Sequence, residues 1–224
     1  LQPRAAKGIM TDSYRTLAAT ASAEMTERKS RFIGQAGPAS TEEEALSFIQ
    51  RARENHKGAS HHCFAYVIGE NAGVMRYQDD GEPQGTAGVP ILETLRKNGL
   101  VNCACVVTRF FGGILLGAGG LARAYGRAAA MAVGAAGVVT AENSVRLSMR
   151  LPYPRWDKVS YALSRLPVLQ TEQEFGADVA ARFVAREKDL SVVLKELAVL
   201  TEGEAKPEIS SPFYALWPQE ASPG

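Results

Sequence analysis

The spacing of apolar residues predicts alternating strands and helices in the first 140 residues of this chain. Alternating or continuous apolar runs predict strands, and apolar residues three or four positions apart predict helices. The predicted strands cover residues 30–36, 62–68, 74–78 and 101–108. The predicted helices lie around residues 45–52, with a capping box from Ser40 or Thr41 and Glu43 or Glu44, and at about 86–98 and 118–136.

The strand at residues 101–108 is apolar at nearly every position, which predicts a central strand buried on both faces. Cys103 and Cys105 lie two residues apart on this strand, so they share a face and are predicted to be buried thiols. The chain has 3 cysteines, an odd number, so we expect no disulfide framework. Free thiols fit a reducing cytoplasm.

The rest of the chain follows the order strand, helix, strand, strand, helix, strand, which is typical of a ferredoxin-like domain. These elements are predicted at residues 144–151, 156–166, 168–175, 177–185, 188–200 and 206–217. We therefore predict an α+β fold with domains at residues 28–140 and 141–218, joined through residues 138–143. Residues 1–27 are interpreted as a tag or N-terminal extension, and residues 219–224 as a tail.

Composition adds little to this picture. Hydrophobic residues make up 46% and charged residues 22%, as in ordinary globular proteins. The net charge is +1, but residues 1–140 carry 15 Lys and Arg against 12 Asp and Glu, which gives +3. This imbalance is a weak indication of anionic partners. No apolar run is long enough to span a membrane and no signal-peptide pattern is present, so we expect a cytoplasmic protein without a membrane partner.

Two glycine-rich segments, residues 79–88 and 108–121, each follow a predicted strand and precede a predicted helix. Glycine lets backbone N–H groups approach a ligand, and a helix N-terminus favours anions. The candidate anion- or RNA-binding residues are Arg109, Gly112, Gly113, Gly117, Gly119, Gly120, Arg123, Arg127, Lys29 and Arg31, with Arg28 in the same basic stretch. The alternative is that these glycines only permit tight packing at a sharp turn. The pattern matches neither a Walker loop nor a dinucleotide fingerprint.

The first segment also contains Asp79, Asp80 and Glu82. Three carboxylates could bind Mg²⁺, but a turn stabilised by aspartate hydrogen bonds to the backbone, with Gly81 at positive φ, is the favoured interpretation. Thr86 is predicted to cap the following helix. If both segments lie at the same end of one sheet, we expect Arg109 to pair with Asp79 or Asp80.

No catalytic set can be identified, and we expect no metal and no cofactor. His61, His62 and Cys63 are consecutive, so they cannot form a zinc site alone, and nothing indicates an activated thiolate. Four aromatic residues near the glycine segments suit either base stacking or core packing, with one or two of them exposed. They are Tyr66, Tyr77, Phe110 and Phe111.

Four blocks of residues resemble the YigZ/IMPACT family. They are residues 29–33 (Lys-Ser-Arg-Phe-Ile), residues 61–66 (His-His-Cys-Phe-Ala-Tyr), residues 79–88 and residues 108–126. The resemblance implies an N-terminal domain of the ribosomal-protein S5 domain-two type and a ferredoxin-like C-terminal domain. That pair resembles the last two domains of the ribosomal translocase elongation factor G. The chain departs from the family pattern at Gln78, Gln84 and Arg127.

The resemblance and the two segments together predict a non-enzymatic cytoplasmic protein that binds RNA or the ribosome and modulates translation. The alternative is a Mg²⁺-dependent enzyme that acts on a phosphorylated small molecule or nucleotide. A third hypothesis is a module that docks a protein partner, which predicts an exposed apolar patch instead of a basic groove.

Overall fold

The computed structural model describes residues 12–217. The fold is α+β, with two sheets and five α-helices among these residues. The described chain divides into two compact units, residues 12–140 with 216–217 and residues 141–215. No helix between residues 12 and 217 is both long enough and apolar enough to cross a membrane.

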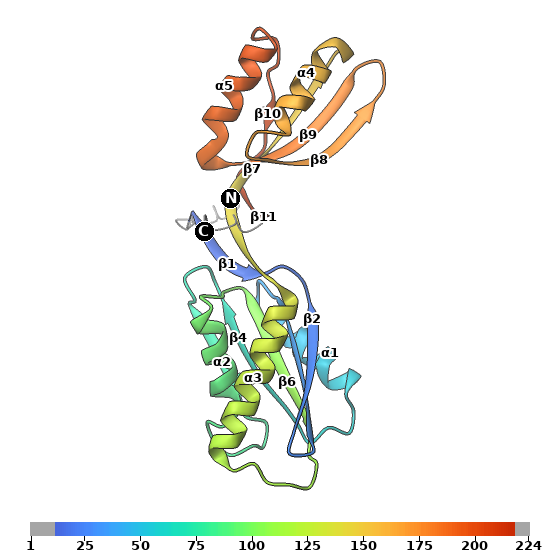
Figure 1. Ribbon diagram of the computed structural model, residues 1–224. Coiled ribbons are helices and arrows are strands. Elements are labelled where there is room, and N and C mark those ends of the chain that lie inside the picture. The colour runs from blue at the N-terminus through green and yellow to red at the C-terminus, as the bar shows by residue number, and fades with distance from the viewer. Residues whose placement is uncertain (1–11, 218–224) are drawn as a thin grey trace, which may run out of the picture. The chain divides into compact units, whose positions relative to one another are not determined.

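The first unit contains a five-stranded sheet in the order β2-β3-β6-β4-β5, in which all neighbours are antiparallel (Figure 1). The strands are β2 (Ala21–Glu27), β3 (Ser30–Pro38), β4 (His61–Ile68), β5 (Val74–Gln78) and β6 (Cys103–Phe110). Every residue of β6 before Phe110 is buried, and β6 is the middle strand. The prediction of a central, doubly buried strand is confirmed.

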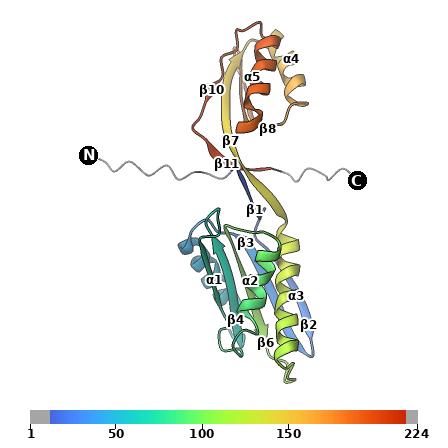
Figure 2. The same cartoon turned by 90° about the vertical axis from the view of Figure 1, so that its left-hand side faces the viewer.

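Helices cover both faces of this sheet (Figure 2). Side chains alternate along β6, so Val106 packs in the cluster beneath α1 (Glu42–Asn55), whereas Val107 packs with α2 (Gly88–Lys97) and α3 (Ala118–Ala136). The predicted cap of α1 is present: the Thr41 hydroxyl accepts from the Glu44 backbone N–H, and the Glu44 carboxylate accepts from the Ser40 N–H.

The strand β2 was not predicted, because its residues fell in the presumed N-terminal extension. Ala21, Ala23 and Met25 alternate with polar residues along β2, which hydrogen-bonds to β3 along its whole length. The hairpin turn uses Arg28 and Lys29, both with positive φ. Such turns favour Asn-Gly or Asp-Gly, so the usual hairpin signal is missing from this sequence.

In the second unit α4 and α5 pack on one face of a sheet in the order β7-β9-β8, with β10 beside β7. The elements are β7 (Val138–Leu151), α4 (Tyr153–Leu163), β8 (Val168–Phe175), β9 (Val179–Arg186), α5 (Leu190–Leu200) and β10 (Glu208–Ile209). Shorter elements are a 3₁₀ turn at Glu187–Asp189, the strand β11 (Phe213–Trp217) and, in the first unit, the strand β1 (Ser13–Leu17). Residues 138–143, predicted as a connection, belong to the strand β7.

The alanine-rich helix α3 lies close to the sheet because small residues face it. A Cβ atom added to Gly34 of β3 would lie 2.4 Å from the Ala128 carbonyl oxygen and 3.0 Å from the Ala132 Cβ. Backbone atoms of α3 therefore occupy the space that a side chain at residue 34 would need. The alanines of α3 permit this close approach, because their side chains are small.

We expect Gly34→Ala to lower the free energy of unfolding by about 2–3 kcal/mol, because α3 must move away from β3. Gly134→Ala is the matched control: Gly134 lies inside α3, no atom lies within 4 Å of its added Cβ, and alanine favours helix by about 1 kcal/mol. Urea unfolding followed by circular dichroism measures both changes. Equal effects of the two variants would contradict this account of the packing.

Candidate functional site

The two glycine segments meet at one end of the first sheet. β5 and β6 both run antiparallel to β4, so their carboxyl ends lie at the same end, and each segment follows one of these strands. The Glu82 carboxylate and the Arg109 guanidinium lie 2.7 Å apart. The segments therefore converge as expected, but the predicted pairing of Arg109 with Asp79 or Asp80 is wrong.

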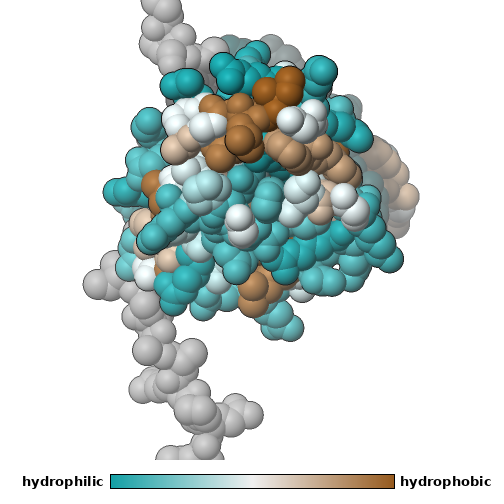
Figure 3. All heavy atoms as spheres, turned by 90° about the horizontal axis from the view of Figure 1, so that it is seen from below, coloured by the Kyte–Doolittle hydropathy of each residue, from teal (hydrophilic) through white to brown (hydrophobic). Residues whose placement is uncertain are grey.

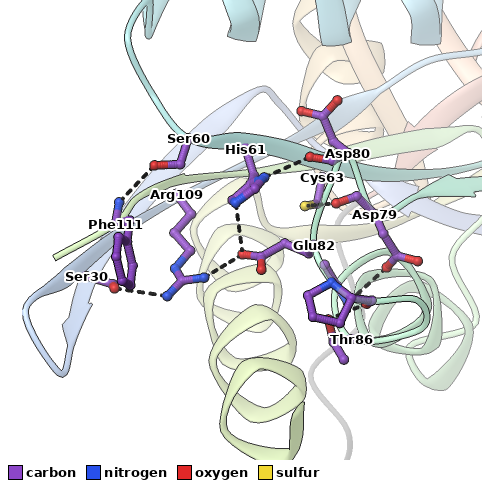
Figure 4. A network of polar contacts seen from close by, with 12 residues as sticks. Ser30, Ser60, His61, Cys63, Asp79, Asp80, Glu82, Thr86, Arg109 and Phe111 are labelled. Atoms are coloured by element: carbon purple, nitrogen blue, oxygen red, sulfur yellow. Dashed lines mark hydrogen bonds and ion pairs between the residues drawn. The ribbon is translucent and has the colours of Figure 1, made fainter. Parts of the chain in front are cut away.

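The ion pair between Glu82 and Arg109 is the centre of a buried network (Figure 4). Oε1 of Glu82 accepts hydrogen bonds from Arg109 at 2.7 Å and from the Tyr125 hydroxyl at 2.8 Å. Arg109 also donates to the Ser30 hydroxyl at 3.1 Å, and its guanidinium lies 5.3 Å from the centre of the Phe111 ring. Arg109 is only 4% exposed, so it connects the segments internally and does not face solvent.

Asp79 holds the beginning of α2. Its carboxylate accepts hydrogen bonds from the backbone N–H groups of Gly85, Ala87 and Gly88 at 2.8–3.0 Å. Thr86, in contrast, donates its hydroxyl proton to the Pro83 carbonyl, and the N-cap position is Ala87. The prediction of Thr86 as the cap is wrong, because a carboxylate from the preceding strand end fills that role.

Asp80 is also used within the protein. Its carboxylate accepts from the His62 N–H at 2.7 Å and lies 3.3 Å from the Arg53 guanidinium, while Gly81 has the expected positive φ of 87°. All three acidic side chains of this segment thus bind the chain itself. No group of three or more His, Cys, Asp or Glu side chains within residues 12–217 is placed to hold a metal ion. This geometry agrees with the turn interpretation.

The buried polar groups of this site are not activated nucleophiles. The Cys63 thiol donates to the Asp79 carbonyl at 2.9 Å, and burial raises the pKa of Cys63 to about 12. Burial also raises the pKa of Tyr125 and, at the opposite end of β6, raises the pKa of Cys103 to about 12. Burial lowers the pKa of His62, whose Nδ1 lies 3.1 Å from the Thr108 hydroxyl.

The second glycine segment combines close packing with open backbone. A Cβ on Gly112 would lie 2.0 Å from the Lys29 carbonyl oxygen, so Gly112 lets this segment contact the β2–β3 turn. Its N–H donates to the Ser30 hydroxyl at 3.2 Å. Gly113 and Gly117 have φ of 82° and 71°, with no atom within 4 Å of an added Cβ. Tight packing therefore explains the glycine at residue 112, but it does not explain the glycines at residues 113 and 117.

A pocket of about 260 Å³ lies between the β2–β3 turn and the first turns of α3. Arg28 comes from the turn, and Arg123 and Arg127 come from α3. The other lining residues are Met25, Glu27, Leu116, Gly120 and Ala124. α3 starts after Gly117 without a side-chain hydrogen bond to its cap, and Leu116 and Gly120 on either side of this start line the pocket, so the positive end of α3 lies beside it.

The remaining predicted cations differ in their surroundings. Lys29 is exposed beside Arg28. Arg31, in contrast, forms a bidentate ion pair in which two guanidinium nitrogens lie 2.7 and 2.8 Å from the two carboxylate oxygens of Glu24. Gly119 and Gly120 lie in the first turn of α3, and an added Cβ on Gly119 would approach the Arg123 guanidinium at 3.7 Å. The cations that surround the pocket are therefore Arg28, Arg123 and Arg127.

Apolar side chains are exposed next to this pocket. In the loop between β6 and α3, Phe111 is 47%, Ile114 39% and Leu115 80% exposed. Figure 3 views the molecule from below and shows apolar side chains gathered among hydrophilic ones. Of the four aromatic residues considered above, Tyr77 and Phe111 are exposed, which agrees with the expectation of one or two.

Ser30 and Tyr125, which add hydrogen bonds to the buried network, were not predicted as site residues, and Arg28 was not distinguished from its basic neighbours. Ser30 and Tyr125 both lie inside the blocks that carry the family resemblance, so the blocks held a signal for them. The signal for Arg28 was weaker, because three of the four residues 28–31 are basic and only its position in the lining of the pocket distinguishes Arg28 from the others.

Comparisons with known proteins identify the same family by its domain and by its individual members. The Impact N-terminal domain family matches residues 28–133. IMPACT family member YvyE of Bacillus subtilis (strain 168) is 39% identical over 196 residues, which are 88% of this chain and 90% of the relative. The chain belongs to the IMPACT family. The resemblance found in the sequence blocks is confirmed.

Two further similarities extend over different shares of this IMPACT-family chain. The IMPACT family member in the pol 5′ region of Thermus thermophilus is 38% identical over 179 residues, 79% of this chain and 96% of the relative. A crystal structure described as that of a hypothetical protein aligns with a TM-score of 0.59 and 28% identity. It covers 88% of this chain and 97% of its own, so the similarity includes both units.

We expect Glu82→Leu to lower the free energy of unfolding by about 3–5 kcal/mol, because Arg109 would keep a buried charge without a partner. Glu24→Leu is the control, since Glu24 and Arg31 lie at the same 2.7 Å separation but remain exposed. That variant should change stability far less, because solvent screens the pair. Urea unfolding compares the two, and equal losses would contradict the importance of burial here.

We expect the native protein to show no reactive thiol towards Ellman's reagent at neutral pH. Burial raises the pKa of Cys63 and of Cys103 to about 12, so the thiolate is scarce, and all three cysteines are buried. All 3 thiols should react after unfolding in guanidinium chloride. Rapid modification of one thiol in the native protein would reopen the question of a nucleophilic cysteine.

Proposed function

We propose that the first unit binds RNA, free or within the ribosome, at the end of the sheet where the glycine segments meet, and that the protein modulates translation without catalysis. The observation that carries this proposal is the cluster of three exposed arginines around one pocket at the beginning of α3. Phosphate contacts from arginine supply most of the sequence-independent affinity for nucleic acids.

The electrostatics of the cluster support an anionic partner. Arg123 and Arg127 are one helical turn apart, and Arg28 faces the same pocket. Like charges at this spacing destabilise a helix, and no ion pair within residues 12–217 joins any of the three to a carboxylate. A bound phosphate would relieve this repulsion and would also interact favourably with the positive end of α3.

Phe111 supplies a surface on which a base can stack. Its ring is about half exposed, its backbone N–H donates to the Ser60 hydroxyl at 3.1 Å, and the buried Arg109 guanidinium lies against it. An aromatic ring fixed in this way loses little freedom on binding. Stacking on aromatic side chains beside cations is how many proteins bind single-stranded RNA.

The fold types belong to the same proposal. We assign the first unit to the ribosomal-protein S5 domain-two type and the second to the ferredoxin-like type. The strand–helix–strand–strand–helix–strand order of the second unit and its sheet order, β10-β7-β9-β8, support the ferredoxin-like assignment. A pair of such domains resembles the end of elongation factor G, which fits a cytoplasmic role at the ribosome.

A second candidate is docking of a protein partner on the exposed apolar residues Ile114 and Leu115. Leu115 is 80% exposed in the same loop as the exposed Phe111 and Ile114, and exposed apolar side chains that are grouped together mark interaction surfaces. Leu115→Ser discriminates between the candidates. RNA binding through the arginines should tolerate this change, whereas docking on the apolar loop should not.

We expect the protein to bind single-stranded RNA with an affinity that falls as salt rises, and Arg123→Gln/Arg127→Gln to weaken binding about 10-fold or more. The slope of the logarithm of the binding constant against the logarithm of the salt concentration should become less steep by about 0.7 for each phosphate that the variant no longer neutralises. Arg51→Gln/Lys57→Gln removes the same charge on the α1 side and should bind normally. Fluorescence anisotropy at several salt concentrations measures this. Absence of salt-dependent binding, or equal weakening in both double variants, would refute the proposal.

A further inference from the structure

We propose that the pocket between the β2–β3 turn and α3 binds a phosphomonoester, either the terminal phosphate of an RNA strand or a free mononucleotide. This inference rests on the proposed function, because it assumes that the arginine cluster faces phosphate. It goes further by proposing that the pocket binds the end of an RNA strand or a single nucleotide. The internal phosphodiesters of a passing strand would then contact only the outer surface.

The size of the pocket supports a small ligand. Its volume is about 260 Å³, close to the lower limit of the ~300–1,000 Å³ typical of ligand pockets. Met25 and Ala124 are almost fully buried and form its floor. A phosphodiester continues in two directions from its phosphorus atom, whereas a phosphomonoester continues in one. A pocket with a closed floor therefore suits the monoester.

The charge of the lining matches a dianion. Three arginines and one glutamate, Glu27, give a formal charge of +3 − 1 = +2. A phosphomonoester carries about −1.5 to −2 at neutral pH and has three terminal oxygens, whereas a diester carries one negative charge. Guanidinium groups bind such oxygens in pairs, so three arginines can engage all of them.

The backbone fixes the arginines from two sides. Arg28 has φ of 45°, an unfavourable conformation for a residue with a side chain, and its guanidinium lies 3.5 Å from the Leu115 carbonyl oxygen. Gly112 lets the β2–β3 turn pack directly on the second segment. Arg28 is thereby held opposite Arg123 and Arg127, which are carried by α3.

The apolar part of the lining suits the rest of a nucleotide. Met25, Leu116 and Ala124 line the pocket together with the arginines, and Leu116 is partly buried against the core. A sugar or base attached to the bound phosphate leaves away from the floor and can pack against Leu116, which is more exposed than Met25 and Ala124. Inorganic phosphate would use the arginines alone, so a nucleotide should bind more tightly than phosphate.

Calorimetric titration of the full chain with adenosine 5′-monophosphate, adenosine and inorganic phosphate at constant ionic strength tests the inference. We expect the monophosphate to bind at least about 10-fold more tightly than adenosine. Arg123→Gln/Arg127→Gln should abolish that difference, and Arg51→Gln/Lys57→Gln should preserve it. A parallel arm compares one single-stranded RNA sequence with a 5′-phosphate, a 3′-phosphate or hydroxyl ends.

The outcomes separate this inference from the proposed function. A preference for a phosphorylated RNA end, abolished in Arg123→Gln/Arg127→Gln, identifies the strand end as the ligand. Binding of the monophosphate without any RNA binding supports the pocket assignment and identifies a free mononucleotide, while the RNA proposal fails. Equal binding of the monophosphate and adenosine, with no preference among RNA ends, overturns the inference even if RNA binds.

Discussion

The buried ion pair between Glu82 and Arg109 holds together the parts of this protein on which its chemistry depends. Glu82 comes from the segment after β5, and Arg109 is the last residue but one of β6. Removing two charges from water is unfavourable unless they also form further hydrogen bonds, and here Tyr125 donates to Glu82 and Arg109 donates to Ser30, although the buried Nε of Arg109 has no partner within residues 12–217. The pair therefore fixes the geometry of both glycine segments.

This arrangement explains why a chain with a net charge of only +1 can present a local cationic site. Asp79, Asp80 and Glu82 accept hydrogen bonds from backbone amides and from Arg109 within the protein, which leaves Glu27 as the one carboxylate among the lining residues of the pocket. Three arginines remain on the surface around one pocket, beside the uncapped beginning of α3. The site is cationic because acidic and basic side chains lie in different places, and not because the chain carries an excess of basic residues.

The sequence predicted most of the regular structure of the first unit, because its apolar spacing is clear. It missed β2, whose hairpin turn has Arg28 and Lys29 where Asn and Gly are usual, and it assigned residues 138–143 to a connection. For the site, it predicted the convergence of the segments but not the partner of Arg109. Asp79 and Asp80 were equally plausible partners, since sequence spacing does not show which carboxylate a helix N-terminus or a strand amide will bind.

The sequence by itself determined the family, the α+β class and the two glycine segments, because these depend on local spacing and on residue types in fixed order. Only the tertiary structure decided that Arg109 is buried, that Gly112 contacts the β2–β3 turn and that Arg28 joins two arginines of α3. Burial, close backbone approach and charge clustering arise between segments far apart in the chain. Local sequence carries no information on which distant atoms share one space, so these properties appear only once the chain is folded.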